Sequence, residues 1–296
     1  MQKIPVYEVG PVAASKTVVI RLEQLIGRRI HGLILEHGYA SGTNTVAAAA
    51  TNLSEIRLIA NNVVKRRVSG TQLRDLLLLN GTIYDGQGVP NTAPGVALTM
   101  PFSEAWRQDR DQRDITAFPT RWGGGKNPLQ QLGSLWLELD LGAASTPTVV
   151  VWAVVDDVVP DVANPAMIEW QPWSIPAGST NFDYSIKQQG VLVALSLYMD
   201  SGGSRPCTRA KLVIDEVVKF DLEDSPNFAD LIFNGVTPTA SGRTASVFDI
   251  VLDRDDNLAR AEALTQRTAL LSIWATAGAM SGTITGVAQV LRGITL

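Results

Sequence analysis

The chain has 296 residues, of which 45% are hydrophobic and 18% are charged, and its formal net charge is -4. This length fits one large domain or two of moderate size, and the composition excludes a disordered chain. A protein that wraps nucleic acid usually carries a basic excess, so the acidic balance argues against direct genome packaging. The single cysteine, Cys207, excludes an intrachain disulfide and fits a cytosolic site of synthesis.

Short apolar runs follow one another along the first half and are separated by turn residues. At 135–141, leucines alternate with Trp136, Glu138 and Asp140, and this period of two predicts a half-buried strand. The other predicted strands of this half cover residues 17–22, 32–36, 55–59, 63–65, 96–100 and 149–155.

The polar stretch 103–133 is the least strand-like part of the first half, and we expect it to be a surface excursion. It contains Trp106, Trp122 and the sequence Gly-Gly-Gly-Lys at 123–126. That sequence lacks the Ser or Thr and the strand–loop–helix context of a phosphate-binding loop, so it predicts a flexible loop.

A proline-rich segment near the middle of the chain predicts the connection between two domains. Proline fixes φ and removes a backbone donor, so we expect neither regular strand nor helix here. Trp170 and Trp173 indicate that the segment packs against something and is not a free tether. The predicted division is an N-terminal domain at 1–158, a connection at 159–178 and a C-terminal domain at 179–296.

The second half, like the first, consists of short apolar runs separated by turn residues. Its predicted strands cover residues 191–197, 210–214, 216–220, 247–252, 269–274 and 283–291. The segment 253–268 predicts a helix, because Leu258, Ala261 and Leu264 share one helical face, with Asp255 or Asp256 as its cap. Many short strands with Gly, Pro, Asn and Asp between them favour β-sandwiches or barrels.

An internal repeat relates the two halves. Residues 56–81 align without a gap over residues 210–235, at an offset of 154 that is close to half the chain. The simplest account is duplication of one β-sandwich unit. Identical pairs include Leu58/Leu212, Val63/Val217, Val64/Val218, Lys65/Lys219, Asn80/Asn234 and Gly81/Gly235.

Both copies predict a strand, a two-residue turn, a second strand and a short helix. Asn61-Asn62 suits the positive φ of a tight hairpin turn, whereas Asp215-Glu216 fits it less well and predicts another turn type. In the second copy, Ser225 is the expected helix cap, with Pro226 at the first helical position. Both helices are expected to end at Asn-Gly, the usual left-handed C-terminal signal.

No residue pattern supports catalysis or a structural metal site. The only histidines, His31 and His37, are six residues apart, a spacing that places both on one face of a strand. A structural zinc site needs four ligands and Cys207 is the only cysteine, so we expect ordinary surface or rim histidines. The chain also lacks the signatures of nucleophilic catalysis, so we predict no catalytic residue and no enzyme activity.

The segment 253–264 starts like a calcium-binding loop. That loop needs Gly at its sixth position and Glu at its twelfth, where this chain has Leu258 and Leu264. We therefore favour helix capping, with a looser calcium site that includes Asp253 and Asp255 as the alternative. No other cofactor is predicted.

Four of the seven tryptophans lie in predicted loops or in the connection: Trp106, Trp122, Trp170 and Trp173. Aromatic side chains in such places are enriched at protein interfaces, and they also occur in carbohydrate-binding sites. Subunit contact is our first interpretation for all four. A sugar platform that includes Trp106 and Trp122 is the alternative.

Three features resemble one family. They are Ile4-Pro5 followed by the Ala-Ser-rich turn 12–15, the module 55–80 with the helical run 73–80 after its strand pair, and two sandwiches in a chain of this length. The chain resembles the major capsid proteins of corticovirus type, from tailless icosahedral phages with an internal membrane. The similarity is clearest over residues 1–85.

The resemblance implies an all-β double jelly roll, with two tandem eight-stranded sandwiches and short helices in loops. It further implies a homotrimer of pseudo-hexagonal outline that tiles the virion capsid over the internal membrane. The expected partners are other copies of the chain, minor capsid and vertex proteins and the membrane, without direct nucleic-acid contact. Synthesis would take place in the host cytoplasm, and some members of the family bind calcium.

Two other classes of protein compete with this interpretation. A carbohydrate-binding β-sandwich protein would use its loop tryptophans to bind sugar, and glycan binding by a monomer would favour it. Another phage structural component, such as a spike or tail protein, is the second alternative, and the internal duplication speaks against it.

Overall fold

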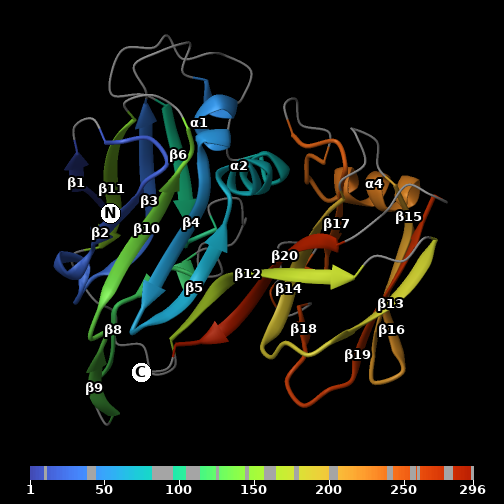
Figure 1. The fold of residues 1–296 in the computed structure, drawn as a ribbon. Helices are drawn as coiled ribbons and strands as arrows, with labels where there is room; N and C mark the ends of the chain where they lie inside the picture. Colours follow the sequence, from blue (N-terminus) through green and yellow to red (C-terminus); the bar gives the residue numbers. More distant parts are fainter. Residues whose placement is uncertain are drawn as a thin grey trace. The chain divides into compact units, whose positions relative to one another are not determined.

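The computed structural model describes residues 1–9, 12–38, 45–81, 96–104, 114–124, 127–143, 147–156, 165–176, 180–199, 206–238, 243–253, 258, 261–276 and 283–294. These residues form mainly β-strands with a few short helices (Figure 1). The chain divides into two units. Unit 1 comprises Met1–Leu78, Thr82–Ile168 and Gly293–Leu296, and unit 2 comprises Leu79–Gly81 and Glu169–Arg292. No helix in the described ranges is long and apolar enough to cross a membrane.

Unit 1 contains two sets of four longer paired strands, and buried residues alternate with exposed or partly exposed ones along several of these strands. One sheet has the order β1-β11-β3-β6, with the short β7 beside β3, and the other has β5-β4-β10-β2. The predicted alternation at 135–141 is confirmed, because every leucine of β10 is buried and the residues between them are partly exposed. The strands are β1 (Gln2–Val9), β2 (Thr17–Arg21), β3 (Arg29–Gly38), β4 (Leu53–Ala60), β5 (Val63–Val68), β6 (Val96–Pro101), β7 (Phe118–Pro119), β10 (Leu135–Leu141) and β11 (Thr148–Asp156).

Unit 1 also carries its helices and one extra hairpin. The 3-10 turn η1 (Glu23–Leu25) follows β2, α1 (Val46–Asn52) precedes β4, and α2 (Gly70–Leu79) follows β5. The last residue of α2, Leu79, is counted with unit 2. The two-stranded hairpin of β8 (Arg121–Gly124) and β9 (Asn127–Gln131) lies within the stretch expected to be a surface loop.

Unit 2 contains two sets of strands arranged like those of unit 1. Their orders are β12-β20-β14-β17, with the short β18 beside β14, and β16-β15-β19-β13. One hydrophobic core lies between these strands and includes Trp173, Leu195, Leu212 and Ile273. The elements are β12 (Ala166–Pro176), β13 (Asn181–Ile186), β14 (Val191–Tyr198), β15 (Cys207–Ile214), β16 (Val217–Glu223), α4 (Asp224–Phe233), β17 (Val247–Val251), β18 (Glu262–Ala263), β19 (Ala269–Ala275) and β20 (Thr283–Gly293).

The two units match strand for strand. In each, the first strand of the unit pairs with its last and the second pairs with its seventh, which is the two-sheet arrangement of a jelly roll. The short strands β7 and β18 match as well, each beside the third strand of its unit. The expected pair of eight-stranded jelly rolls, and with it the duplication, is therefore confirmed.

The predicted connection is not free of regular structure. The boundary between the units falls at residues 168 and 169, inside the predicted 159–178, but residues 166–176 form the long strand β12. Pro172 and Pro176 occupy exposed positions that alternate with the buried Trp173 and Ile175. The fixed φ of proline is compatible with extended backbone, and proline lacks only the backbone N–H that would donate a hydrogen bond to a neighbouring strand. The prolines therefore do not exclude a strand here.

Two further expectations are corrected. The stretch 103–133 is not a surface excursion throughout, because Ala117, Phe118 and Thr120 are buried. The segment 253–268 is not a continuous helix, since Glu262 and Ala263 form β18 and pair with β14. This pairing with a distant strand overrides the local helical spacing of the apolar residues.

Candidate assembly surface

Both copies of the repeat fold into a hairpin with the same tight turn. The backbone φ is 50° at Asn61 and 63° at Asn62, and it is 48° at Asp215 and 66° at Glu216. Positive φ at both central residues defines the type I′ turn, whose twist matches that of paired strands. The prediction of another turn type for the second copy is therefore wrong.

A reciprocal pair of hydrogen bonds joins each turn to a neighbouring strand connection. The Asn61 N–H donates to the Ser134 carbonyl (3.1 Å), and the Ser134 N–H donates to Asn61 Oδ1 (3.2 Å). Asp215 and Thr268 exchange the same two hydrogen bonds at 2.9 and 3.0 Å. Because Asn and Asp both supply the side-chain oxygen and both tolerate left-handed backbone, either residue serves at this position.

Each hairpin carries a β-bulge at the same residue of the repeat. In unit 1 the register passes from Val64 to Arg66 and skips Lys65, and in unit 2 it passes from Val218 to Phe220 and skips Lys219. A bulge of this kind changes which face the following residues occupy. The valine pairs between turn and bulge, Val63–Val64 and Val217–Val218, are exposed in both units.

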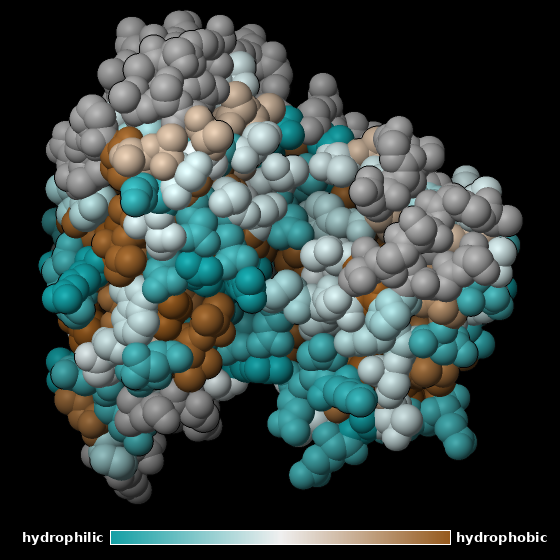
Figure 2. All heavy atoms as spheres, in the orientation of Figure 1, coloured by the Kyte–Doolittle hydropathy of each residue, from teal (hydrophilic) through white to brown (hydrophobic). Residues whose placement is uncertain are grey.

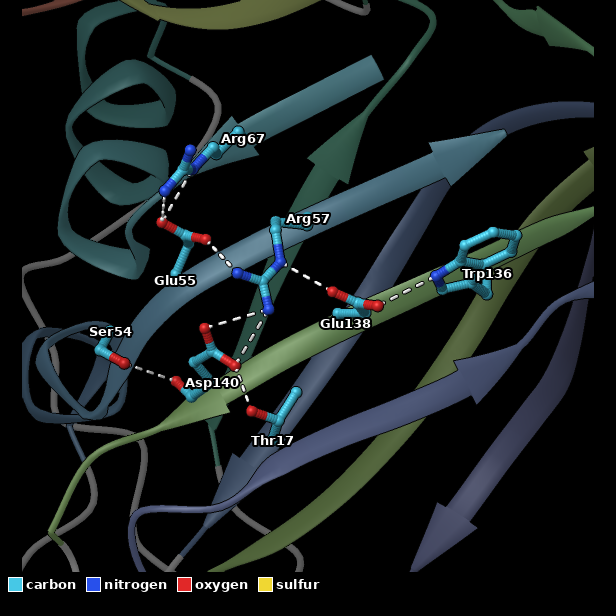
Figure 3. A network of polar contacts seen from close by, with 8 residues as sticks. All are labelled: Thr17, Ser54, Glu55, Arg57, Arg67, Trp136, Glu138 and Asp140. Atoms are coloured by element: carbon cyan, nitrogen blue, oxygen red, sulfur yellow. Dashed lines mark hydrogen bonds and ion pairs between the residues drawn. The ribbon is translucent and has the colours of Figure 1, made fainter. Parts of the chain in front are cut away.

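A network of ion pairs covers the outer face of the second sheet of unit 1 (Figure 3). Arg57 lies at its centre and contacts Glu55 (2.5 Å), Glu138 (2.8 Å) and Asp140 (3.2 Å). Although burial acts to lower the pKa of Arg57, these three carboxylates outweigh it and raise that pKa. Arg67 pairs with the other oxygen of Glu55 at 2.8 Å. The remaining members of the network are Thr17, Ser54 and Trp136.

The corresponding face of unit 2 carries an ion pair at the same place. Arg209 and Asp221 are offset by 154 residues from Glu55 and Arg67, and they form two hydrogen bonds at 2.7 and 2.8 Å. The guanidinium of Arg209 also lies over the ring of Trp274, 4.9 Å from its centroid. Each unit thus keeps a cross-strand ion pair at this position, with the two charges exchanged.

His31 belongs to a buried polar cluster in unit 1. Its Nε2 lies 2.8 Å from Asp156 Oδ2, and Arg29 Nε donates to the same oxygen at 3.0 Å. Partial burial acts to raise the pKa of Asp156, but the hydrogen bonds from Arg29 and His31 lower it to about 2. The cluster joins the third and last strands of the jelly roll by opposite charges.

His37 lies at the other end of the same strand and is buried as well. Its Nδ1 is 3.2 Å from the Thr148 carbonyl, and its Nε2 is 2.7 Å from the side-chain nitrogen of Asn52. Burial lowers the pKa of His37. The neutral ring with its proton on Nδ1 satisfies both contacts, since it donates to the carbonyl and accepts from the amide. The expectation of surface histidines is therefore wrong, because the tertiary fold brings polar partners to both rings.

The two helices that follow the hairpins end alike but begin differently. Gly81 and Gly235 follow them with positive φ of 63° and 80°, which confirms the predicted Asn-Gly ends. In α2, Ser69 and Gln72 each accept a hydrogen bond from the other's backbone N–H, a capping box. In α4 the helix begins at Asp224, so Ser225 is not the cap. Pro226 then stands third, where its missing N–H costs no helical bond.

Exposed apolar side chains occur in both units. Figure 2 shows brown apolar patches among hydrophilic side chains on one face of the molecule. Besides the two valine pairs, the last turn of α4 exposes Ile232 and Phe233. Sequence reasoning missed this turn, because the corresponding Leu78 and Leu79 of α2 are equally apolar and the hydrophobic pattern does not distinguish a covered helix end from a bare one.

The tryptophans predicted at subunit contacts lie elsewhere. Trp122, Trp170 and Trp173 are 3%, 4% and 2% exposed, so they pack inside the chain. Trp122 Nε1 donates to Gln130 of the neighbouring strand β9 (2.7 Å). Trp106 lies outside the described residues. The interface interpretation of the three described tryptophans is corrected, because β12 and the β8–β9 hairpin are ordered elements whose tryptophans face inward.

The calcium candidates do not form a site in the part of the chain that the structure describes. Asp253 is buried, and Asp255 lies outside the described residues. Among the described residues, no group of three or more His, Cys, Asp or Glu side chains is placed to hold a metal ion. Burial raises the pKa of the Cys207 thiol to about 12, which keeps it protonated and unreactive.

Solved structures of capsid proteins share this fold. The major capsid protein P2 from bacteriophage PM2 has a TM-score of 0.74 at 12% identity, with 99% of this chain and 98% of that chain covered. The STIV (Sulfolobus turreted icosahedral virus) major capsid protein has a TM-score of 0.66 at 13% identity, covering 98% and 95%. The PBCV-1 protein VP54 has 0.63 at 11% identity, covering 99% and 94%. No curated protein matches the chain in sequence.

The fold is that of the double jelly-roll capsid proteins. The model of the viral coat protein P2 N-terminal domain matches residues 3–156, which is more than half of the chain. This protein therefore belongs to the viral coat protein P2 family. It is a structural component of a virion capsid and not an enzyme, and the predicted corticovirus-type resemblance is confirmed.

Proposed function

We propose that this coat protein is the major capsid protein of its virus and assembles as a homotrimer. The observation that carries the proposal is that one chain contains two jelly rolls with the same strand order. Three chains supply six such units, enough for a tile of pseudo-hexagonal outline with sixfold-like contacts. Such tiles pack into an icosahedral shell over an internal membrane, and minor capsid and vertex proteins complete the shell.

The outer surface of the described residues supports an assembling subunit. Obligate interfaces bury about 2,000–5,000 Å² and are more apolar than ordinary surface. The exposed valine pairs of the two hairpins and the last turn of α4 are apolar positions of that kind. The net charge of -4 suits a shell separated from its genome by a membrane, because polyanionic DNA is not attracted to it.

Light scattering coupled to size-exclusion chromatography tests the trimer. One chain has a mass of 31.8 kDa, so a trimer has a mass of about 95 kDa. We expect a species of that mass that persists on dilution. A chain that stays monomeric at moderate concentration would overturn the trimer and turn attention to glycan binding.

The glycan-binding alternative is less well supported. A sugar platform needs an exposed aromatic face, and Trp122 is buried with its indole N–H bonded to Gln130. Binding on a glycan array by a monomer, with loss of binding in a Trp106→Ala variant, would favour that alternative.

A further inference from the structure

Each unit carries a row of side chains across the outer face of one sheet, beside its hairpin turn. Residues that lie directly opposite each other on neighbouring strands point to the same face of a sheet. In unit 1, Trp136 joins the network on the outer face of the second sheet, so its cross-strand neighbours also lie on that face (Figure 3). These pairings define the first row, which consists of Arg21, Trp136, Ile59 and Val64.

Unit 2 has a row at the equivalent place. Val213 and Val218 pair across its hairpin and are offset by 154 residues from Ile59 and Val64, which pair in the same way. The second row consists of Ser185, Leu270, Val213 and Val218. Each row crosses all four strands of its sheet, and its three members nearest the hairpin are apolar in both units.

Much of the apolar surface of both rows is open to solvent. Val64 is 41% exposed, Val218 50% and Leu270 36%. The two exposed valines are identical in the two copies of the repeat, whereas the buried position of Ile56 is occupied by Ala210 in the second copy. Threonine satisfies the preference of a strand without exposing as much apolar surface. Retention of valine at both exposed places therefore indicates a contact that the two units share.

Unpaired charges of opposite sign lie at opposite ends of the two rows. Arg21 is the exposed member of the first row on β2, and the exposed Glu216 lies in the turn beside Val218, at the β16 end of the second row. Neither side chain forms an ion pair with another described residue. When a first row and a second row lie antiparallel and face to face, Arg21 of one meets Glu216 of the other. Two first rows would instead place Arg21 against the uncharged turn Asn61-Asn62.

We infer that the first row of one copy packs antiparallel against the second row of a neighbouring copy, with Arg21 beside Glu216. This inference rests on the proposed function and specifies one contact of the trimer. Because the contact joins unit 1 of one copy to unit 2 of the next, it runs head to tail. Contacts of this kind close into a ring when the rotation between copies allows it, and three copies suffice for the proposed tile.

The surroundings of the rows suit an interface between proteins, which has an apolar centre and a polar rim. The ion-pair network around Arg57 borders the first row, and the pair Arg209–Asp221 lies on the same face as the second row. The acidic turn Asp215-Glu216 beside the exposed valines disfavours a lipid surface, because anionic membranes attract segments rich in Lys and Arg. A second copy of the chain fits this chemistry better than an anionic membrane does.

The first test compares the unmodified chain with a Val218→Asp variant by light scattering over a dilution series. Because Val218 is half exposed, thermal unfolding of the single chain should change little. We expect the concentration for half-assembly to rise about tenfold or more, because the new carboxylate faces an apolar row without a partner. Leu129→Asp places the same charge on an exposed leucine of β9, outside both rows, and should assemble like the unmodified chain.

Reversal of the two charges tests the antiparallel alignment. Arg21→Glu and Glu216→Arg should each weaken assembly several-fold, because like charges then face each other across the contact. Both side chains are exposed, so the single chain should fold as before. The variant with both substitutions should regain most of the loss. Losses that add in the double variant would overturn the alignment.

The outcomes separate this inference from the trimer itself. A trimer formed equally well by the unmodified chain and by Val218→Asp overturns the contact between the rows and leaves the trimer standing. A chain that is monomeric throughout the dilution series overturns both.

A second measurement identifies the occupant. With the photoreactive residue benzoylphenylalanine in place of Val218, irradiation of the assembled protein should give a covalent band of twice the chain mass. Peptide mapping should join position 218 to the segment around Arg21 or Trp136 of the other copy. A cross-link between two second rows, or one confined to a single chain, would overturn the inference. So would flotation of single chains with phosphatidylethanolamine–phosphatidylglycerol vesicles that Val218→Asp abolishes, without any cross-linked dimer.

Discussion

Arg209 and Asp221 form in unit 2 the ion pair that Glu55 and Arg67 form in unit 1, with acid and base exchanged. In both units the two partners come from neighbouring strands of the same hairpin. A position that keeps its pairing while its polarity reverses indicates that the sheet needs two opposite charges there and not a particular one. Duplicated units diverge in this way when changes on facing strands compensate each other.

The first prediction concerns this exchange of charge. Arg209→Glu should destabilise unit 2, because it places two carboxylates on facing strands, and Asp221→Arg should do so by the reverse repulsion. The double variant should recover most of the loss. Because an exposed ion pair contributes little to stability, urea unfolding in a double-mutant cycle, which isolates the coupling between the two side chains, is the appropriate measurement. Additive losses in the double variant would contradict the interpretation.

His37 predicts a loss of stability in mildly acidic solution. Its pKa is lowered in the folded protein because burial disfavours the charged ring. The unfolded chain therefore takes up the proton first, and the contribution of His37 to stability is complete above pH 6.5 and is lost as the pH falls through the folded pKa. The loss should not exceed about 1.4 kcal/mol per pH unit for one proton. Thermal unfolding between pH 8 and 5 measures it, and His37→Gln should flatten the profile.

Asp156 makes the stability of the fold depend on pH in a more acidic range than His37 does. Its folded pKa of about 2 lies below the ordinary aspartate value of 3.8, so its stabilising effect is present above pH 4 and is lost as the pH falls toward 2. Hydrogen bonds to charged groups contribute about 1.5–3 kcal/mol, and Asp156→Asn should cost an amount in that range at neutral pH. The control is Asp140→Asn, which should cost less, because Arg57 keeps two other carboxylates. Equal losses from both variants would argue against a special role for the Asp156 cluster.

A glycine at the start of α2 should resist even the smallest substitution. A Cβ at Gly70 would lie 2.3 Å from the Ala50 carbonyl oxygen and 2.8 Å from the Leu53 Cβ. Alanine ordinarily favours a helix over glycine, yet here Gly70→Ala should destabilise the fold by about 1–3 kcal/mol, because backbone must move. At Gly235 a Cβ meets nothing, so Gly235→Ala should incur only the strain of positive φ, about 1 kcal/mol. Chemical denaturation of both variants decides the order.

The predictable part of the fold rests on signals that are local. Alternating leucines gave the bounds of β10 correctly, and the repeat revealed the duplication and both Asn-Gly helix ends. The strand β1 was missed because its residues 2–9 mix polar and apolar types without a clear period, and β12 was missed because of its prolines. Strand partners from the far end of the unit determine both elements, and no local window contains that information.

The candidate site was less predictable than the fold. Tryptophans in supposed loops suggested contacts, but Trp122, Trp170 and Trp173 turned out to be buried. Residue type predicts the tendency to be buried, whereas the actual exposure of Phe233 depends on which parts of the chain cover its helix. The comparison of two copies of one module supplies that information, because one copy is the reference for the other.

The pairing of β1 with β11 has a consequence for synthesis of the protein. Gln2 pairs with Val155, so the first strand lacks its partner until the last strand of unit 1 has been translated. At about 5–20 residues per second this delay lasts roughly 7–30 s, during which one strand of the sheet waits unpaired. The second jelly roll repeats the delay, because β12 must wait for β20 near the end of the chain. Neither unit can complete its fold before its own last strand has been translated. Folded subunits that are ready to assemble therefore appear only after that strand has been made.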